Sequence, residues 1–511
     1  MIRHYYFSSS IVLVMLAASA VSQGQQAHSL AFNDYAPQHM EMRIASQPQF
    51  GYLSIPGIGN TAVAVSNSML HPAQWLSQSP SGSLATIELD EVFDSWEAPN
   101  RLAVDLQMDW LQFGKFFKDK RSFVHGGIRE IAHFSLELPS DLLRLPFTGN
   151  ANFELLGDDA LDLADFGVRA EHRRSFYLGW QRNWNEKWSS GVRVNYLRGI
   201  RHGELAIEDL KWSTNEVTWD WAFEGQGSVQ SSGMWPLAQF LDSGKLDDAA
   251  VTQLQEELIS GVGTGFGLDL GVEYRVNAKW LAFAQVNDLG SMRWKQDIRN
   301  LSTQSTTFEF SGLDWSAADD WTVQGAEDSL AGYGQAVADD LEQDLALDED
   351  AVPYRTGLGA KWSLGAEFTP WPAVKWQPSL GMLVRKNGAL PLSWRASWNQ
   401  AWGRWMKTSL SFGARDGLGS SAGISVAWNA GPFVVTAAAD SHRLLNWTAF
   451  DLDDSTGETS ESIRFPTYAP LAHVQIGVVW RMGWMPKRDR SETKSECEPF
   501  AVPSSTRIPQ F

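Results

Sequence analysis

The residues that could carry catalytic chemistry are the histidines, together with the many serines and aspartates of the chain. His125, His133 and His473 lie in segments of alternating polarity, on the same side as the charged residues. A hydrolase would need such groups to converge within hydrogen-bond reach. The sequence contains neither a G-x-S-x-G nor an H-E-x-x-H motif that would bring them together. We therefore predict no enzyme and no catalytic residues. These side chains are assigned to the polar interior of the β-barrel that the strand pattern below predicts.

A glycine-rich run from Gly261 to Gly267, G-V-G-T-G-F-G, has the composition of a nucleotide-binding loop. A phosphate-binding loop leads into a helix, whereas these glycines continue as one face of an extended segment. Inside a strand, glycine permits curvature or the close approach of a plug. We expect no cofactor.

The acidic insertion at 313–352 carries twelve acidic residues and no Lys or Arg. A cation site is imaginable from Asp339, Asp340, Asp344, Asp348, Glu349 and Asp350. The spacing is not that of a calcium loop, so a solvated acidic helix face is the preferred interpretation. Cys497 is the single cysteine, which excludes an intramolecular disulfide and a thiolate cluster. No metal is predicted.

The stretch 263–276, G-T-G-F-G-L-D-L-G-V-E-Y-R-V, places apolar side chains on one parity and glycines or charges on the other. Successive side chains of a strand point to opposite faces, so one face of this strand is fully apolar. The pattern recurs at 102–110, 176–181, 191–196, 358–368 and 473–484. One such strand also occurs in soluble sheets, but many of them behind an export signal predict an all-β, transmembrane antiparallel barrel. A secreted β-sandwich or propeller is the lesser alternative.

The inward parity of these strands carries charges of both signs. The lumen-facing candidates are Asp105, Asp109, Arg129, Arg193, Asp269, Glu273, Arg275, Lys361, Glu367, Arg385, Arg395, Arg415 and Arg481. Two arrangements fit: the charges pair across the lumen and close it, or they line a polar pore. A barrel this wide must be filled by water, by loops or by residues 25–60, which precede the first firm strand.

The expected organisation is a signal peptide at 1–24, an N-terminal segment or plug at 25–60, a barrel at 61–484 and a flexible periplasmic tail at 485–511. The apolar stretch of the signal is too short to span a bilayer, and cleavage is expected after Ala20 or Gly24. The net charge of −19 argues against nucleic acid as a partner.

Tight turns alternate with long connections, as in outer-membrane barrels with short periplasmic turns and longer outer loops. The longer connections are about 139–164, 202–262, 290–352 and 441–470. Thirteen strands between Leu102 and Trp484 and one at Thr61–Ser68 give fourteen, with twelve or sixteen as alternatives. Apolar spacing predicts one outer-loop helix ending at Gly261 and a second over 330–345.

The segments 175–200 and 265–295 carry a Leu-Gly-Trp strand, a Gly-Leu-Asp-Leu-Gly strand and an Asp288-Leu289-Gly290 corner before Arg293-Trp294. In these features the chain resembles a Bacteroidota family of outer-membrane barrels of unknown function. That family is akin to the PorP/SprF proteins of type IX secretion and, more distantly, to fatty-acid-channel-like barrels. The resemblance implies a barrel and identifies no activity.

The function expected from these features is that of a non-catalytic outer-membrane component of the cell envelope. Its partners would be outer-membrane lipid and envelope proteins, reached through loops 202–262 and 313–352 and the tail 485–511. The alternative is a channel or porin for a small solute. An occluded lumen would favour the first function, and a continuous water path would favour the second.

Overall fold

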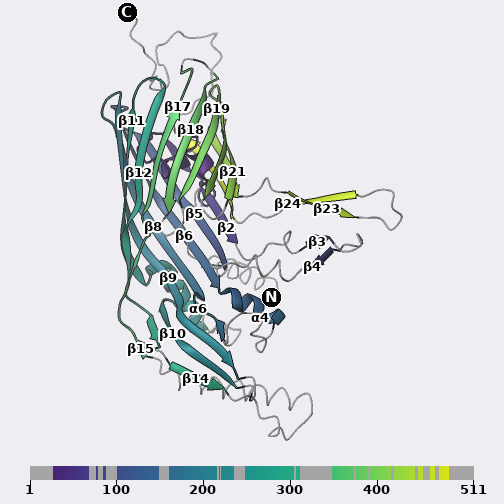
Figure 1. Cartoon of the computed structure of the whole chain (residues 1–511). Helices are drawn as coiled ribbons and strands as arrows, with labels where there is room; N and C mark the ends of the chain where they lie inside the picture. Colours follow the sequence, from purple (N-terminus) through teal and green to yellow (C-terminus); the bar gives the residue numbers. More distant parts are fainter. Residues whose placement is uncertain are drawn as a thin grey trace, which may run out of the picture.

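The structure, a computed structural model, is a tall antiparallel β-barrel with its N-terminal segment inside (Figure 1). It describes residues 27–67, 76–78, 85–87, 100–148, 160–215, 218, 220–234, 248–303, 306–310, 348–372, 374, 376–387, 392–415, 419–442, 447–452, 461–466 and 471–482. The predicted signal peptide, the second helix at 330–345 and the tail 485–511 lie outside these residues. No helix in the described part is long and apolar enough to cross a membrane.

Fourteen strands form the closed barrel, which confirms the predicted fold and strand number. In order around the wall they are β2 (Thr61–Asn67), β5 (Asn100–Phe116), β6 (Ser122–Leu138), β8 (Gly167–Asn183), β9 (Trp188–Thr214), β11 (Gly263–Arg275), β12 (Trp280–Trp294), β17 (Lys361–Phe368), β18 (Pro378–Asn387), β19 (Ser393–Trp402), β20 (Met406–Arg415), β21 (Gly419–Ala430), β22 (Phe433–His442) and β25 (Leu471–Arg481). The ladder between β2 and β25 closes the ring, with Val63 opposite Val474. β1 (Tyr52–Ser54) pairs with the same two neighbours as β2, so the two are halves of one wall strand.

Alternation along each strand separates the two faces of the wall. On β11, Phe266 is 63% exposed and Leu270 is 42% exposed, whereas Asp269 between them is fully buried. The same outward exposure of large apolar side chains recurs at Leu364, Met382, Leu410, Ile424 and Ile476. A soluble protein would bury such a surface, so this apolar belt is the part of the wall suited to lipid.

Two rows of aromatic residues bracket the belt. Towards the short turns, Trp188 packs on Tyr274 with ring centroids 4.5 Å apart. Towards the long loops, Tyr196 packs on Phe266 at 5.5 Å. The rows lie eight residues apart on β11, which is ~26 Å along the strand. At a strand tilt of about 35–45° this is ~20 Å along the barrel axis, comparable with the apolar band of about 25 Å in outer-membrane barrels.

The short turns meet at one end of the barrel, at the top in Figure 1. β8 and β9 are joined through Trp184 and Trp188, and β21 and β22 through a turn at Gly431, whose φ is +64°. The tight turns at Asn185–Lys187, Asn277–Ala278, Trp402–Gly403 and Ala430–Pro432 all lie here. β25 also ends at this side.

The long connections contain more regular structure than the sequence predicted. The segment 202–262 was expected to be a loop, but β9 runs on to Thr214 and pairs with β10 (Trp221–Ser232). β13 (Ile298–Ser302) and β14 (Thr306–Phe310) extend this sheet, with β15 (Asp348–Asp350) beside β13. We call this extension beyond the long-loop rim the apron. Side chains on both faces of β10 and β13 are at least partly exposed along most of each strand, so these strands lack the apolar parity by which wall strands are recognised.

The remaining elements are short. α6 (Asp248–Ser260) is the helix predicted to end at Gly261, whose φ is +70°. α4 (Ser140–Thr148) was not predicted. The others are η1 (His28–Leu30), η2 (Pro37–Glu41), β3 (Leu76–Gln78), β4 (Ala85–Ile87), β7 (Ala160–Asp162), β16 (Arg355–Gly357), β23 (Trp447–Leu452) and β24 (Glu461–Pro466).

Candidate functional site

The candidate site is the contact between the barrel wall and the N-terminal segment, which lies inside the lumen. Residues 27–46, here called the plug, form η1, η2 and tight turns between and after them. Almost every plug residue is buried, including the charged Glu41 and Arg43, each 5% exposed. The burial comes from the surrounding wall, because the plug has no sheet partner of its own.

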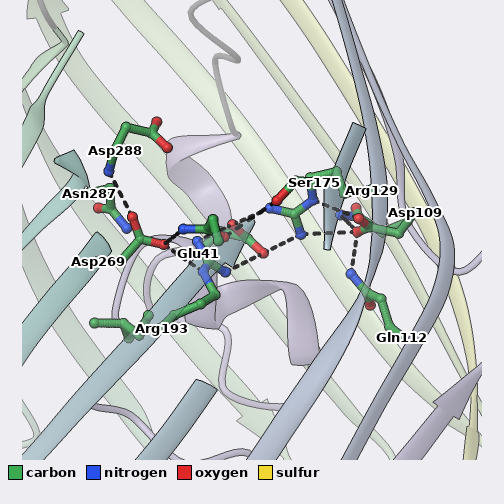
Figure 2. Close-up of polar contacts among 12 residues, drawn as sticks. Glu41, Asp109, Gln112, Arg129, Ser175, Arg193, Asp269, Asn287 and Asp288 are labelled. Atoms are coloured by element: carbon green, nitrogen blue, oxygen red, sulfur yellow. Dashed lines mark hydrogen bonds and ion pairs between the residues drawn. The ribbon is translucent and has the colours of Figure 1, made fainter. Parts of the chain in front are cut away.

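Glu41 at the end of η2 is the centre of the largest ion cluster (Figure 2). Arg129 of β6 donates from Nη1 to Oε2 at 2.8 Å and also from Nη2 to Oε1. Arg193 of β9 donates from Nη1 and Nη2 to the two oxygens at 3.0 and 3.1 Å. Two wall guanidinium groups therefore hold one plug carboxylate, and both can bind it in the bidentate geometry that makes such pairs strong.

Each of these arginines also binds a wall aspartate. Arg129 Nε donates to Asp109 Oδ1 at 2.6 Å, and Arg193 Nε donates to Asp269 Oδ2 at 2.6 Å. Asp269 in turn accepts the backbone N–H of Asp288 at 2.7 Å. The wall aspartates thus fix the direction in which both guanidinium groups point, and the plug carboxylate fits between groups already oriented.

The other two charged plug residues bind the wall in the same manner. Arg43 lies 2.9 Å from Glu273 of β11 and 3.1 Å from Glu367 of β17. Asp34 lies 2.6 Å from Lys407 of β20, and its side chain is 37% exposed. Every charged side chain of the plug, His aside, is therefore matched by an opposite charge from the wall.

Hydrogen bonds to plug backbone complete the attachment. Gln285 of β12 accepts the N–H of Ile44 at 2.8 Å and donates to the carbonyl oxygen of Glu41 at 3.1 Å. On the far side of the lumen, the Ser425 hydroxyl donates to the carbonyl oxygen of Ser29 at 2.8 Å. The plug therefore bridges the lumen from β12 to β21.

Wall glycines provide the room that the plug occupies. A Cβ at Gly271 would lie 2.5 Å from Ile44 Cγ2, and one at Gly381 would lie 2.6 Å from the ring of Phe32. At Gly191 the clash would be with the carbonyl oxygen of Ile44, which cannot rotate away. Here the strand glycines serve the close approach of a plug, one of the two roles anticipated from the sequence.

Apolar contacts fill the space between the ion pairs. Phe32 meets Phe283 edge to face, with centroids 5.9 Å apart, and Met42 joins the same cluster. Met40 packs in a second cluster with Tyr52 and Phe123. The plug is thus packed against the wall as well as ion-paired to it.

Electrostatics favour the charged form of Glu41 inside the lumen. Burial alone would raise the pKa of this carboxyl, because a charge loses its hydration there. The guanidinium groups of Arg129 and Arg193 outweigh burial and hold the pKa of Glu41 below its usual range. For His39, burial outweighs the opposing negative charge of Asp34 and lowers the pKa to about 4, so its ring is neutral at pH 7.

The predicted lumen-facing residues fall into three groups. Buried inside the barrel are Asp105, Asp109, Arg129, Arg193, Asp269, Glu273, Lys361, Arg385 and Arg395. Partly buried are Arg275, Glu367 and Arg481, and the Arg415 side chain lies outside the described part. Four of the first group surround Glu41; of the remainder, Lys361 binds Asp288 at 2.7 Å and Arg395 binds Asp440 at 3.1 Å.

The plug charges themselves were not singled out from the sequence. Asp34, Glu41 and Arg43 are the charged residues, His aside, in the stretch 27–50, and all three bind the wall. The signal that could have identified these three residues is their isolation, because they are the few charges in a largely uncharged segment that precedes the first wall strand. In the described part of the chain, no group of three or more His, Cys, Asp or Glu side chains is arranged to hold a metal ion.

The cluster around Glu41 can hold a segment of chain inside the lumen, because both arginines bind the plug carboxylate and a wall aspartate at once. Elsewhere in the lumen, His133 Nδ1 lies 2.7 Å from Asp105 Oδ1.

Comparisons with solved structures find barrels of low identity. The toluene transporter TbuX of Ralstonia pickettii is 8% identical, with 88% of this chain and 94% of that chain covered and a TM-score of 0.38. A FadL homologue of Pseudomonas aeruginosa is 9% identical, with 84% of this chain and 90% of that chain covered and a TM-score of 0.37. The translocator domain of the autotransporter NalP from Neisseria meningitidis is 8% identical, with 89% of this chain and 98% of that chain covered and a TM-score of 0.30. Similarities of this size carry no conclusion about cargo or partners.

At the level of sequence, no curated protein matches the chain. The model of a family of unknown function, DUF5723, matches residues 45–440, which span β1 to β22 and include the end of the plug. The chain belongs to this family of unknown function, DUF5723.

Proposed function

We propose that the chain is a non-catalytic outer-membrane component of the cell envelope, with a lumen closed by its own N-terminal plug. The observation that carries this proposal is the binding of Glu41 by Arg129 and Arg193. Buried charges are costly unless paired, so a lumen built to conduct would not ordinarily hold this cluster across its width. The lumen charges are used to retain the plug.

Placement in the outer membrane is supported by the wall itself. Its apolar belt is bracketed by aromatic rows at a separation suited to the hydrocarbon layer. Short turns at one end and long connections at the other favour a periplasmic side at Gly431 and an outer side at the apron. The N-terminal leader inferred from the sequence supports export.

An interaction or assembly role is favoured by the apron. Trp212 of β9 packs on Trp221 and Phe223 of β10, each with centroids 5.1 Å apart, which makes this part of the outer end rigid. A rigid platform beyond the membrane suits protein partners better than a bare pore mouth would. Together with loops 202–262 and 313–352 and the tail 485–511, it would contact envelope proteins, as the resemblance to PorP/SprF proteins suggests.

The alternative function is a channel whose plug moves. It is favoured by the polar nature of many plug contacts, because water can replace ion pairs and hydrogen bonds once the plug shifts. On this alternative, Asp34, Glu41 and Arg43 would be the groups that release the wall when a solute or partner draws the plug away.

Conductance of the purified protein in planar bilayers separates the two functions. We expect the full-length protein to insert without steady conductance steps, and a variant lacking residues 27–46 to give steps under the same voltage. The deleted variant shows that the conditions allow insertion and detection of an open barrel. Steady ohmic conductance of the full-length protein would overturn the closed-lumen proposal and favour the channel.

A further inference from the structure

Four arginines form one row across the outer face of the barrel at its long-loop rim. The backbone register places Arg174 of β8 opposite Arg198 of β9, and Thr264 of β11 lies between Arg198 and Arg293 of β12. Arg293 is directly opposite Arg355 of β16. All four side chains are on the outward parity of their strands. We call them the arginine row.

The arginine row lies at the depth of lipid headgroups. Two residues below it on the same strands, towards the belt, are the aromatic side chains Phe176, Tyr196 and Phe266, which pack in sequence at 6.3 and 5.5 Å. Aromatic side chains of this kind mark the boundary between hydrocarbon and headgroups. Cations just beyond them face the anionic groups of the membrane surface.

Two of the four arginines have protein partners. Arg174 Nη1 donates to the carbonyl oxygen of Leu258 at 3.0 Å, and it also binds Glu130. Arg198 Nη1 donates to the carbonyl oxygens of Ser260 and Ile259 at 2.7 and 3.2 Å. These carbonyls form the C-terminal end of α6, whose partial negative charge attracts cations. Half of the row therefore anchors α6 to the wall.

The other two arginines have no such partner. Arg293 and Arg355 are exposed, and no ion pair or side-chain hydrogen bond to either is found among the described residues. Like charges directly opposite one another on neighbouring strands destabilise a sheet. A bound anion would relieve this repulsion, because two guanidinium groups side by side can hold one phosphate through several N–H donors.

A groove in the wall continues from these two arginines into the apolar belt. Its volume is about 460 Å³, and its rim is formed by Arg293, Arg355 and Thr264. Its lower part is lined by Phe266 and Leu289, with Val194, Leu268 and Ser291 beside them. Gly290 forms part of the floor, and a Cβ there would clash with the carbonyl oxygen of Phe266. Cationic at the rim and apolar below, the groove has the polarity of a lipid molecule.

We propose that this groove binds a membrane lipid with a phosphate-bearing headgroup, held by Arg293 and Arg355 with an acyl chain along Phe266 and Leu289. A lipid is favoured over free phosphate because the apolar part of the groove is continuous with the belt and has no role in holding a small anion. The proposal rests on the membrane placement proposed above. It is independent of whether the lumen is closed.

The test titrates purified protein in detergent micelles with diphosphorylated lipid A, phosphatidylcholine or inorganic phosphate. The readout is the midpoint temperature of the heat-modifiable gel transition, which also shows that each variant is folded. We expect lipid A to raise the midpoint, and neither phosphatidylcholine nor inorganic phosphate to do so. In the variant R293Q/R355Q the apparent affinity should fall by about tenfold or more, because charge-assisted hydrogen bonds are lost.

The matched control removes two exposed cations at the opposite rim. K187Q/K279Q changes the net charge equally and should keep the full response to lipid A. A second variant, R293K/R355K, keeps both charges and should retain most of the response. Equal lipid A responses of R293Q/R355Q and the unmodified protein would overturn the proposal. So would a response to inorganic phosphate alone, which would indicate an anion site without a lipid.

Discussion

Replacement of Glu41 by Gln is the sharpest perturbation of the plug. The change removes the negative charge that Arg129 and Arg193 share and keeps the shape of the side chain. Both guanidinium groups keep one aspartate each, Asp109 and Asp269, so neither becomes an unpaired buried cation. The loss should therefore be smaller than the roughly 3–5 kcal/mol typical of breaking a buried pair outright.

The magnitude follows from the bonds that the amide cannot make. Glu41 accepts four N–H donors, two from each arginine, whereas the Gln amide offers one oxygen and turns an NH₂ group towards a cation. With hydrogen bonds to charged groups at ~1.5–3 kcal/mol each and partial retention, we expect a loss of about 2–3 kcal/mol. That corresponds to about a 30- to 150-fold increase in the released plug. R129Q should cost more, because it takes a cation from Glu41 and Asp109 together.

Hydrogen–deuterium exchange of residues 27–46 in the purified protein measures this release directly. Peptides of the plug should exchange about 30- to 150-fold faster in E41Q, while wall strands such as β19 keep their protection. E137Q is the matched control, because it makes the same substitution in the Arg101–Glu137 pair of the wall, whose two side chains are about a third exposed, and such pairs are worth about 0.2–1 kcal/mol. Plug protection in E41Q equal to that in E137Q would refute the assignment of Glu41 as the main anchor.

Three further predictions concern the plug's fit, its pH dependence and the lipid-facing wall. G191A should speed plug exchange without loss of the barrel, since its methyl group meets the Ile44 carbonyl oxygen; unchanged exchange would contradict the close approach. The pKa of His39 falls from 6.5 to about 4 in the seated plug, so a released plug takes up a proton in that window. Plug protection should therefore decrease as the pH falls from 6.5 to 4, and H39Q should abolish the slope. L270R should impair assembly by about 2–4 kcal/mol, whereas G357R on the same face near the rim should cost at most about 1; equal gel migration of the two would refute the depth assignment.

The barrel was predictable because lipid and water separate the two faces of each wall strand. Phe266, Leu270 and Val272 alternate with Gly267, Asp269 and Gly271 for this reason, and the strand count followed from the repetition of the pattern. The apron was missed because β10 and β13 are at least partly exposed on both faces along most of each strand, so neither has an apolar parity. α6 was found because its apolar spacing and the terminal Gly261 are local signals.

The site was predictable only in part. Wall residues such as Arg193 could be assigned to the lumen by parity, but their partners could not, since Glu41 lies 152 residues away in the sequence. The segment before the first strand was a candidate plug on grounds of lumen volume alone. Its anchoring by Glu41 and Arg43 depends on contacts that no local pattern encodes. The resemblance at 175–200 and 265–295 indicated a barrel family without a known activity. The family that matches, DUF5723, is likewise one of unknown function.

A disulfide between plug and wall tests the central claim, that residues 27–46 occupy the lumen of the membrane-inserted protein. Asn33 Nδ2 lies 3.3 Å from Ser425 Oγ, so N33C/S425C in a C497S background brings two thiols together. Oxidation of membranes from cells that make this variant should give an internally cross-linked species of altered gel mobility that reverts on reduction. The control pair N33C/S135C, with Ser135 in the long-loop half of β6, should give none. Absence of the cross-link in N33C/S425C, with both thiols shown to be free, would mean that the plug does not occupy the lumen.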